Sequence, residues 1–205
     1  MASAANSQTD AKATVWLKPK QVDQLRSATV ENSADYLTGR NDAMIATLYD
    51  TGLRVNELVS LDVDMFDLDD ALLGLPADIQ KDYPNDNTPT YAPIGLDEDT
   101  VRTLRMYLAN RWKDSTAVFP TRQSPRIGTE SVRNVVTDAA AAAGIRPYTT
   151  LGRGEPEDVT PHTLRHSVAY RMINHEGKSL YEVTKRLRHA TIQTTERVYA
   201  HFDRV

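Results

Sequence analysis

The residues best suited to chemistry lie near the end of the chain, between Thr160 and Tyr199. Thr160 before Pro161 predicts the start of a helix, because threonine caps a first turn and proline fits its first position. His162 and Arg165 lie three residues apart and therefore share one face of that helix. Since a helix N-terminus is the positive end of the helix dipole and has free N–H groups, this pattern favours binding of a phosphate.

A second face of the same helix is apolar at four-residue spacing and predicts burial: Leu164, Val168 and Met172. Gly177 should end this helix, and Ser179 should cap another with its own apolar stripe: Leu180, Val183 and Leu187. His189 and Tyr199 follow. A single tyrosine on a helix usually packs, and we expect this of the other tyrosines, including Tyr170 and Tyr181. A single histidine at a helix start is usually a cap or a surface group, and we expect this of His166, His175 and His201.

Four motifs resemble the signature of the tyrosine recombinase (phage integrase) family. They are TGLRVNEL at 51–58, H-x-L-R-H at 162–166, L-x-H at 187–189 and the terminal Tyr199. The resemblance covers roughly residues 15–201. It implies an α+β, mainly helical fold, that of the recombinase catalytic domain, with a small antiparallel β-sheet.

The resemblance implies six catalytic residues: Arg54, Lys81, His162, Arg165, His189 and Tyr199. The two arginines would clamp the scissile phosphate, since guanidinium groups bind phosphate bidentately. The phenol would attack and form a 3′-phosphotyrosyl link, with the first histidine as base or orienting group and the second bonded to a phosphate oxygen. The lysine would protonate the leaving oxygen. We expect no cofactor and no metal, because two histidines four residues apart without the metalloprotease glutamate are a weak zinc signal.

The roles of Arg54 and Lys81 depend on the motif or segment in which each residue lies. A surface salt bridge with Glu57 would explain Arg54 by itself, but within TGLRVNEL the resemblance makes Arg54 the first catalytic arginine and Glu57 a buried acid that holds the site. Lys81 is the only basic residue between Arg54 and Arg102, where the family carries a mobile lysine on a hairpin. Lysine suits a general acid because its pKa shifts readily. A solvated hairpin lysine is the alternative.

Patterns elsewhere predict a helical core with one sheet. Apolar spacing and capping residues predict helices at 41–50, 54–59, 97–108 and 129–144. The Asp-rich segment 61–95, with a turn at 84–87, predicts the small sheet. Residues 148–161 predict a loop, and an earlier loop contains Arg122 and Arg126, which either bind phosphate or are solvated.

Length and composition fit one domain with a polar N-terminal extension. A chain of 205 residues can bury a substantial core. We expect a disordered tail at 1–14 and a catalytic domain at 15–205 without a separate N-terminal DNA-clamping domain, as a fragment or as a minimal family member. The lack of cysteine excludes disulfides and thiolate metal sites and fits a cytoplasmic protein. No apolar run approaches the ~18 residues of a membrane span, and the N-terminus does not resemble a signal peptide.

Charge is divided unevenly along the chain. Residues 1–120 contain 11 Lys/Arg and 19 Asp/Glu, whereas residues 121–205 contain 13 and 9. The asymmetry favours phosphate contacts in the C-terminal half, and an unevenly charged solvated surface explains it equally well. Charge therefore permits DNA binding and does not establish it.

Two features depart from the family's pattern. Arg188 precedes His189 where glycine is common, and Tyr199 follows His189 by ten positions, one more than usual. One extra residue would rotate the tyrosine by about 100° on a helix, unless a looser turn around 190–195 absorbs it. Only six residues follow Tyr199. Together, these features bear more on whether the chain assembles as a tetramer than on whether it performs the phosphate chemistry.

We interpret the chain as a site-specific recombinase or integrase that cuts and rejoins duplex DNA. Its expected partners are double-stranded DNA and further copies of the chain, as a dimer or tetramer on DNA, with no membrane. Two alternatives stay open: a type IB topoisomerase-like nicking and closing enzyme, and a regulator that binds recombination sites without cutting them. The presence of the arginines, the histidine and the tyrosine argues against the regulator, because a protein that only binds DNA has no need for the phenol.

Overall fold

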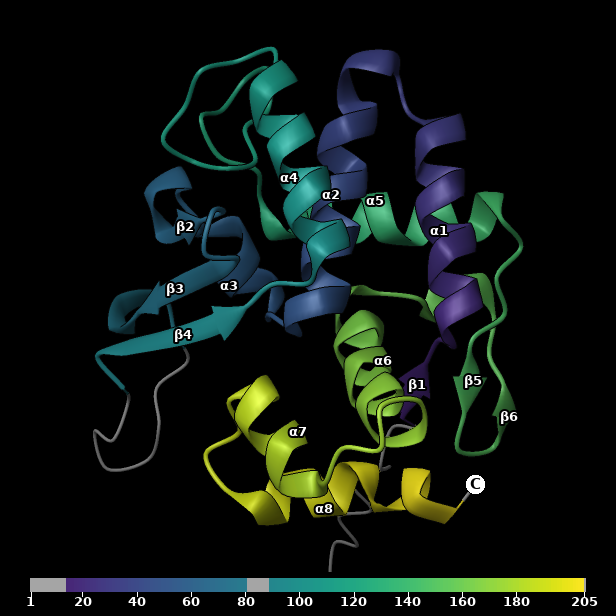
Figure 1. Cartoon of the computed structure of the whole chain (residues 1–205). Helices are drawn as coiled ribbons and strands as arrows, with labels where there is room; N and C mark the ends of the chain where they lie inside the picture. Colours follow the sequence, from purple (N-terminus) through teal and green to yellow (C-terminus); the bar gives the residue numbers. More distant parts are fainter. Residues whose placement is uncertain (1–13, 81–88, 205) are drawn as a thin grey trace, which may run out of the picture.

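The computed structural model describes residues 14–80 and 89–204, without the side chains of 203 and 204 (Figure 1). Its α-helices are α1 (Pro19–Asn32), α2 (Asp35–Thr51), α3 (Val55–Val59), α4 (Glu98–Asn110), α5 (Thr129–Ala142), α6 (Pro161–Asn174), α7 (Leu180–Leu187) and α8 (Ile192–Tyr199). Short 3-10 turns lie at Val63–Met65, Ala77–Ile79, Pro156–Asp158 and Ala200–Arg204. Lys81 and the turn expected at 84–87 lie outside the described residues.

Helices α1, α2, α4 and α5 form one layer above α6, which lies near the middle of the molecule (Figure 1). Helix α2 packs against α1, α4 and α6, and it is longer than the expected 41–50. It begins at Asp35 with a first turn that is exposed or half-buried, and its buried residues start at Arg40. Arg40 donates to the Pro120 carbonyl at 3.1 Å and to the Asn41 side chain at 2.9 Å. The expected helices at 54–59, 97–108 and 129–144 are present, the last one beginning after Gly128.

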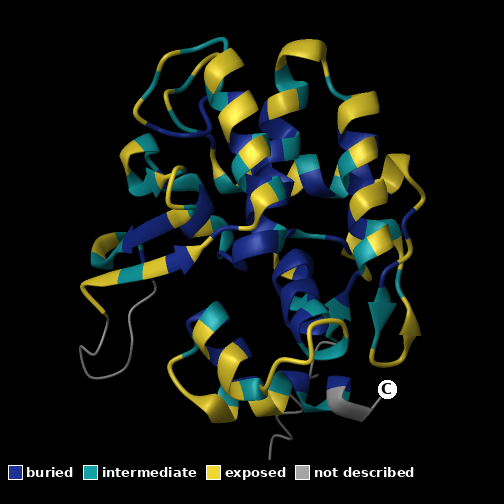
Figure 2. Cartoon of the chain, in the orientation of Figure 1, coloured by how far each residue is buried: buried dark blue, intermediate teal, exposed yellow. Residues whose placement is uncertain are grey.

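The core divides into two buried groups that meet at α6. The larger one joins α2, α4, α5 and the sheet beneath them, and it includes Leu164 of α6. The smaller one joins α6, α7 and the end of the chain, with Val168, Leu187, Tyr199 and Phe202 all at most 1% exposed. Helix α6 is accordingly among the most buried elements (Figure 2). Buried on several sides, it can hold polar residues in fixed positions.

Two small antiparallel sheets flank the helices. The first, β2 (Phe66–Asp67), β3 (Leu72–Pro76) and β4 (Tyr91–Gly95), confirms the sheet expected at 61–95. The second corrects the loop expected at 148–161: β5 (Tyr148–Thr149) and β6 (Gly152–Arg153) form a hairpin on β1 (Val15–Trp16). Strands of two residues carry no periodicity that a sequence pattern could reveal. They form because β5 pairs with a segment far away in sequence.

Helix α6 ends earlier than expected. Its last residue is Asn174, and Gly177 adopts its left-handed φ of 64° in the connection that follows. Ser179 caps α7 as expected, since its hydroxyl accepts from the Glu182 backbone N–H at 3.3 Å while Glu182 accepts from the Ser179 N–H at 2.8 Å. Within the described ranges, no helix is both long and apolar enough to cross a membrane.

Candidate active site

The C-terminal end of α2 forms one wall of the site. Gly52 caps α2 in the left-handed region, with φ 64°, and its N–H donates to the Leu48 carbonyl at 3.0 Å. An added Cβ at Gly52 would lie 2.5 Å from a methyl carbon of Leu187. Glycine is therefore required both by the backbone conformation and by the close approach of α7. The turn delivers Arg54 to the start of α3.

Arg54 is held by Glu57, one turn further along. The Glu57 carboxylate accepts from Nη1 of Arg54 at 3.0 Å and from the backbone N–H of Arg54 at 2.7 Å. The Glu57 side chain is 2% exposed and that of Arg54 is 27% exposed. Thus the acid is buried, while the arginine it orients reaches the surface.

Arg165 lies on the buried side of the first turn of α6 and joins two distant segments. Its guanidinium donates to the carbonyl of Gly52 and to the carbonyl of Leu187. Next to it is a cavity of about 240 Å³, lined by Arg165 together with Leu53, Arg54, Val55, Asn56, Pro161 and His162. Both motif arginines and the first motif histidine therefore line a single cavity large enough for a phosphate.

Tyr199, the last residue of α8, is 1% exposed and points back toward α6. Its hydroxyl lies 2.8 Å from Nδ1 of His166. Helix α8 begins only at Ile192, after its N-cap Thr191, so the first positions after His189 are not helical. The tyrosine is thus directed toward the motif histidines.

His189 lies beside the tyrosine, with the two rings stacked at 6.1 Å between centroids and 7° between planes. Its Nδ1 is 2.8 Å from the hydroxyl of Thr195, which also lies 2.8 Å from the hydroxyl of Thr184. Two threonines, one on α7 and one on α8, therefore fix the orientation of His189. His162 is exposed at the mouth, and its ring lies 4.2 Å from that of His166.

Burial governs the electrostatics of the rings. It raises the pKa of Tyr199 to about 12, although the positive charges of Arg165 and Arg54 act in the opposite direction. It lowers the pKa of His166 and that of His189 to about 3, and neighbouring histidines and arginines lower both further. At neutral pH both buried histidines are uncharged, and the resting phenol keeps its proton.

The charged groups of the site shift one another's pKa values. Burial, together with the charges of Arg54 and Arg188, lowers the pKa of Arg165 to about 9, so Arg165 stays cationic at neutral pH. Burial alone would raise the pKa of Glu57, but Arg188 and Arg54 outweigh it and hold that pKa below its ordinary value of 4.5. The site thus contains three arginines around one ionised carboxylate.

Five of the six residues expected at the site come together in the structure: Arg54, His162, Arg165, His189 and Tyr199. The sixth, Lys81, lies outside the described residues. The position of Arg126 favours a structural role over phosphate binding, since it pairs with Asp62 at 2.6 Å. Tyr181, expected to be packed, is 58% exposed.

Two residues near the chemistry were not recognised from the sequence. The sequence pattern alone predicts a cap or surface group at His166, whereas in the structure His166 contacts the hydroxyl of Tyr199. Its position four residues after His162 places both rings on one helix face, which was the available signal. Arg188 was noted only as a departure, and its guanidinium lies 2.8 Å from Glu57. No local pattern indicates that contact, which joins residues 131 positions apart.

The fold is that of a tyrosine recombinase catalytic domain. The chain resembles the crystal structure of XerA recombinase with a TM-score of 0.72 and 24% identity, covering 96% of this chain and 62% of that one. It resembles the catalytic domain of bacteriophage HP1 integrase with a TM-score of 0.59 and 19% identity, covering 91% of this chain and 87% of that one. A further neighbour is XerH site-specific recombinase bound to palindromic difH substrate, at a TM-score of 0.69 and 19% identity, covering 90% of this chain and 49% of that one.

The model of the phage integrase family matches residues 15–204, and the chain belongs to this family. Tyrosine recombinase XerC of Pseudomonas syringae pv. tomato is 31% identical over 188 residues, which cover 90% of this chain and 56% of the relative. Tyrosine recombinase XerD of Mycobacterium tuberculosis is 35% identical over 162 residues, which cover 78% of this chain and 47% of the relative. The chain therefore spans about half the length of the curated relatives it matches.

Proposed function

We propose that the protein cuts and rejoins duplex DNA at specific sites through a 3′-phosphotyrosyl intermediate. The observation that carries this proposal is the position of Tyr199. Its buried phenol points into a cluster where Arg165 and Arg54 act on its pKa and where His166 contacts its hydroxyl. A phenol held beside two permanent cations and a neutral imidazole suits attack on a phosphodiester. The family and the recombinase relatives support the same reaction.

The scissile phosphate would occupy the cavity that Arg54, His162 and Arg165 line. Each guanidinium has five N–H donors. Arg165 uses donors on Nη1 and Nη2 for the carbonyls of Gly52 and Leu187, and Arg54 uses one for Glu57. The remaining donors can bind the equatorial oxygens as negative charge develops in the pentavalent transition state. His189 would donate a further hydrogen bond to a phosphate oxygen.

In the cutting step, Oη of Tyr199 would form a bond to phosphorus while the bond from phosphorus to the 5′-oxygen breaks. The phenolic proton would pass to the histidines at this edge. Neutral His166 can accept a hydrogen bond through Nδ1 when its proton is on Nε2, and the adjoining ring of His162 leads to the surface. The leaving 5′-oxygen would take a proton from a general acid, for which we retain Lys81.

Rejoining would reverse these steps with a different 5′-hydroxyl as the attacking group. The bond energy is kept in the phosphotyrosyl ester, so no ATP is needed. The same residues serve both directions, since the acid of one step is the base of the reverse step.

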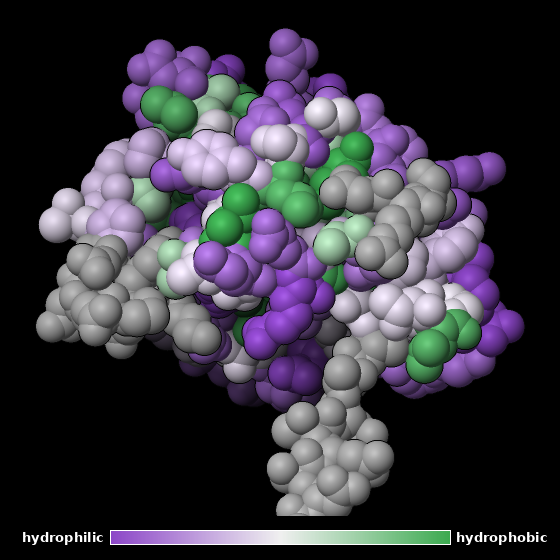
Figure 3. Space-filling model, turned by 90° about the horizontal axis from the view of Figure 1, so that it is seen from below, coloured by the Kyte–Doolittle hydropathy of each residue, from purple (hydrophilic) through white to green (hydrophobic). Residues whose placement is uncertain are grey.

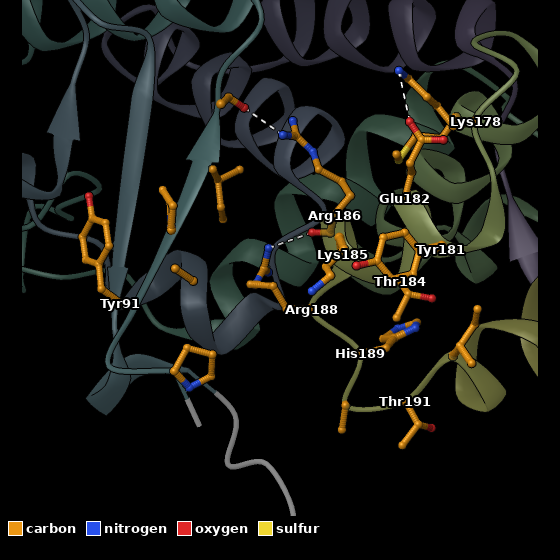
Figure 4. Close-up of a pocket in the computed structure, with 18 residues that line it drawn as sticks. Tyr91, Lys178, Tyr181, Glu182, Thr184, Lys185, Arg186, Arg188, His189 and Thr191 are labelled. Atoms are coloured by element: carbon orange, nitrogen blue, oxygen red, sulfur yellow. Dashed lines mark hydrogen bonds and ion pairs between the residues drawn. The ribbon is translucent and has the colours of Figure 1, made fainter. Parts of the chain in front are cut away.

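Double-stranded DNA is the proposed partner, with further copies of the chain as a dimer or tetramer. A groove of about 890 Å³ between β4 and α7 adjoins the site and carries basic side chains: Lys178, Lys185 and Arg186 (Figure 4). The face seen from below Figure 1, where α7 and α8 lie, carries many hydrophilic residues around a group of hydrophobic ones near its centre (Figure 3). Such surfaces suit contacts with the phosphate backbone. Because the XerC and XerD relatives are bacterial and bacterial DNA lies in the cytoplasm, we propose that compartment as the place of action.

The test is covalent trapping on nicked suicide duplexes, drawn from a pool of DNA of the host element so that the recognised site is included. The wild type should form a protein–DNA band that survives denaturation, and Tyr199→Phe should abolish it. Tyr170→Phe, which changes another buried tyrosine of the same core, serves as the matched control and should keep the band.

Other results of these assays would support a different function. A band that persists in Tyr199→Phe would mean that another residue attacks. DNA binding without a band would support the non-cutting regulator. Relaxation of plasmids without sequence preference, by a wild type that also forms the band, would support the topoisomerase-like enzyme.

A further inference from the structure

Arg188 occupies a backbone conformation that favours glycine. Its φ is 53°, and the only other non-glycine residue with positive φ in the described part of the chain is Ala71, also at 53°. In this region Cβ crowds the backbone, so a residue other than glycine is disfavoured unless its surroundings hold it in place. An arginine here therefore indicates that its side chain makes a contact that glycine could not make.

The side chain of Arg188 is buried and directed into the protein. Arg188 as a whole is 8% exposed. Nη1 donates to the Arg186 carbonyl at 3.0 Å, a contact visible in Figure 4. Nη2 donates to Oε2 of Glu57 at 2.8 Å. The guanidinium thus connects the end of α7 to the first turn of α3.

Glu57 is shared between two arginines. Oε1 accepts from Nη1 of Arg54, and Oε2 accepts both the backbone N–H of Arg54 and Nη2 of Arg188. A carboxylate that is 2% exposed needs compensating charge and hydrogen bonds to stay ionised. Without Arg188, Oε2 would keep only the backbone N–H, and the carboxylate could turn or take up a proton.

We propose that Arg188 is a positioning residue: it holds the ionised Glu57 carboxylate in the orientation that aims Arg54 into the phosphate cavity. The proposal rests on the proposed cutting function. Arg188 acts through Glu57 and needs no contact with DNA. The same turn also supplies the Leu187 carbonyl that Arg165 binds, so one left-handed residue supports both arginines of the cavity.

The first experiment compares Arg188→Gly, Arg188→Lys and Ala71→Gly in single-turnover formation of the covalent adduct on nicked DNA. Both glycine variants relieve the same backbone conformation, and only Arg188→Gly removes a guanidinium beside the site. At saturating DNA, Arg188→Gly should reduce the adduct rate roughly tenfold to a hundredfold, the size expected from a misplaced catalytic group. Half-saturation by DNA should stay unchanged, Arg188→Lys should recover part of the rate, and Ala71→Gly should match the wild type.

Two results would overturn the proposal: an Arg188→Gly rate equal to that of Ala71→Gly, or a weaker affinity for DNA with a normal maximal rate. The second result would make Arg188 a DNA contact. Circular dichroism at the assay temperature checks that each variant is folded.

A second experiment is independent of cutting. Urea unfolding of Arg188→Gly, Glu57→Gln and the double variant forms a double-mutant cycle, which should show a favourable coupling between the two side chains. If the wild type binds DNA and forms no adduct, the proposed function fails, and this cycle alone decides the pairing. Zero coupling would overturn the proposal for Arg188 in either case.

Discussion

Mild acid should destabilise the protein through His166. Burial, with the nearby charges of His162 and Arg165, lowers the pKa of His166 from 6.5 to about 3 in the folded state. The unfolded chain therefore takes up this proton first, so the contribution is complete above pH 6.5 and is lost progressively as the pH falls toward 3. Each unit in that window costs about 1.4 kcal/mol per proton, so His166 alone should account for a loss of about 2 kcal/mol between pH 7 and pH 5.

The assay is urea unfolding of the wild type and His166→Asn at pH 7 and pH 5. Asparagine keeps an oxygen that can accept from the hydroxyl of Tyr199, but it does not titrate. The difference in unfolding free energy between the two pH values should be smaller by about 2 kcal/mol in the variant. His175→Asn, at an exposed position, is the matched control and should keep the wild-type dependence. An equal pH dependence in the wild type and His166→Asn would refute the reasoning.

Two further predictions concern the wall formed by α2 and α3. Gly52→Ala should destabilise the fold by more than ~1 kcal/mol and slow adduct formation, because its Cβ would lie 2.5 Å from Leu187 and would displace the carbonyl that binds Arg165. Gly95→Ala, where an added Cβ meets nothing within 4 Å, should leave the urea midpoint unchanged or slightly raised. Glu57→Gln keeps the side-chain shape and removes the buried charge, so urea unfolding should show a loss of roughly 3 kcal/mol; a loss below 1 kcal/mol would mean that the carboxylate is not a buried ion-pair partner.

Most of the fold could be predicted because its elements carry local signals. Helix α6 begins after Thr160 at Pro161, as expected, and Ser179 with Glu182 caps α7. These starts could be predicted because capping contacts span only three or four positions. The sheet of β2, β3 and β4 followed from short apolar runs between turn residues. The second sheet had no such signal, because its two-residue strands form by pairing between Trp16 and Tyr148.

The start of α2 was missed for a related reason. Arg40 and Asn41 are buried polar residues whose partners include the Pro120 carbonyl and the Ser33 hydroxyl. A pattern of apolar spacing treats Arg40 as surface, and the residues before it, Asp35 to Gly39, are exposed or half-buried and show no apolar face, so the pattern places the helix start too late. Burial of a polar side chain depends on where its partner lies, and that information is not local.

The site residues also divide into those that sequence motifs predict and those that they do not. Motifs predicted the residues that would touch the phosphate and the acid Glu57 that holds Arg54, and they left out two other supporting residues, His166 and Arg188. His166 and Arg188 act through single contacts, to Tyr199 at 2.8 Å and to Glu57 at 2.8 Å, that join segments 33 and 131 positions apart. Arg188 differs from the family's common glycine and was noted as a departure. Its left-handed φ, known only from the structure, is what gives that departure a physical meaning.

Arg165 explains why three distant motifs form one site. It is 3% exposed, and burying a guanidinium without partners would be costly. Its partners are the carbonyls of Gly52 and Leu187, 113 and 22 positions away. The same bonds that make its burial tolerable also fix the turn before Arg54 against the turn before His189. Substitutions at the two carbonyl-bearing turns should therefore alter phosphate chemistry without any contact with DNA, because they move the one residue that all three segments share.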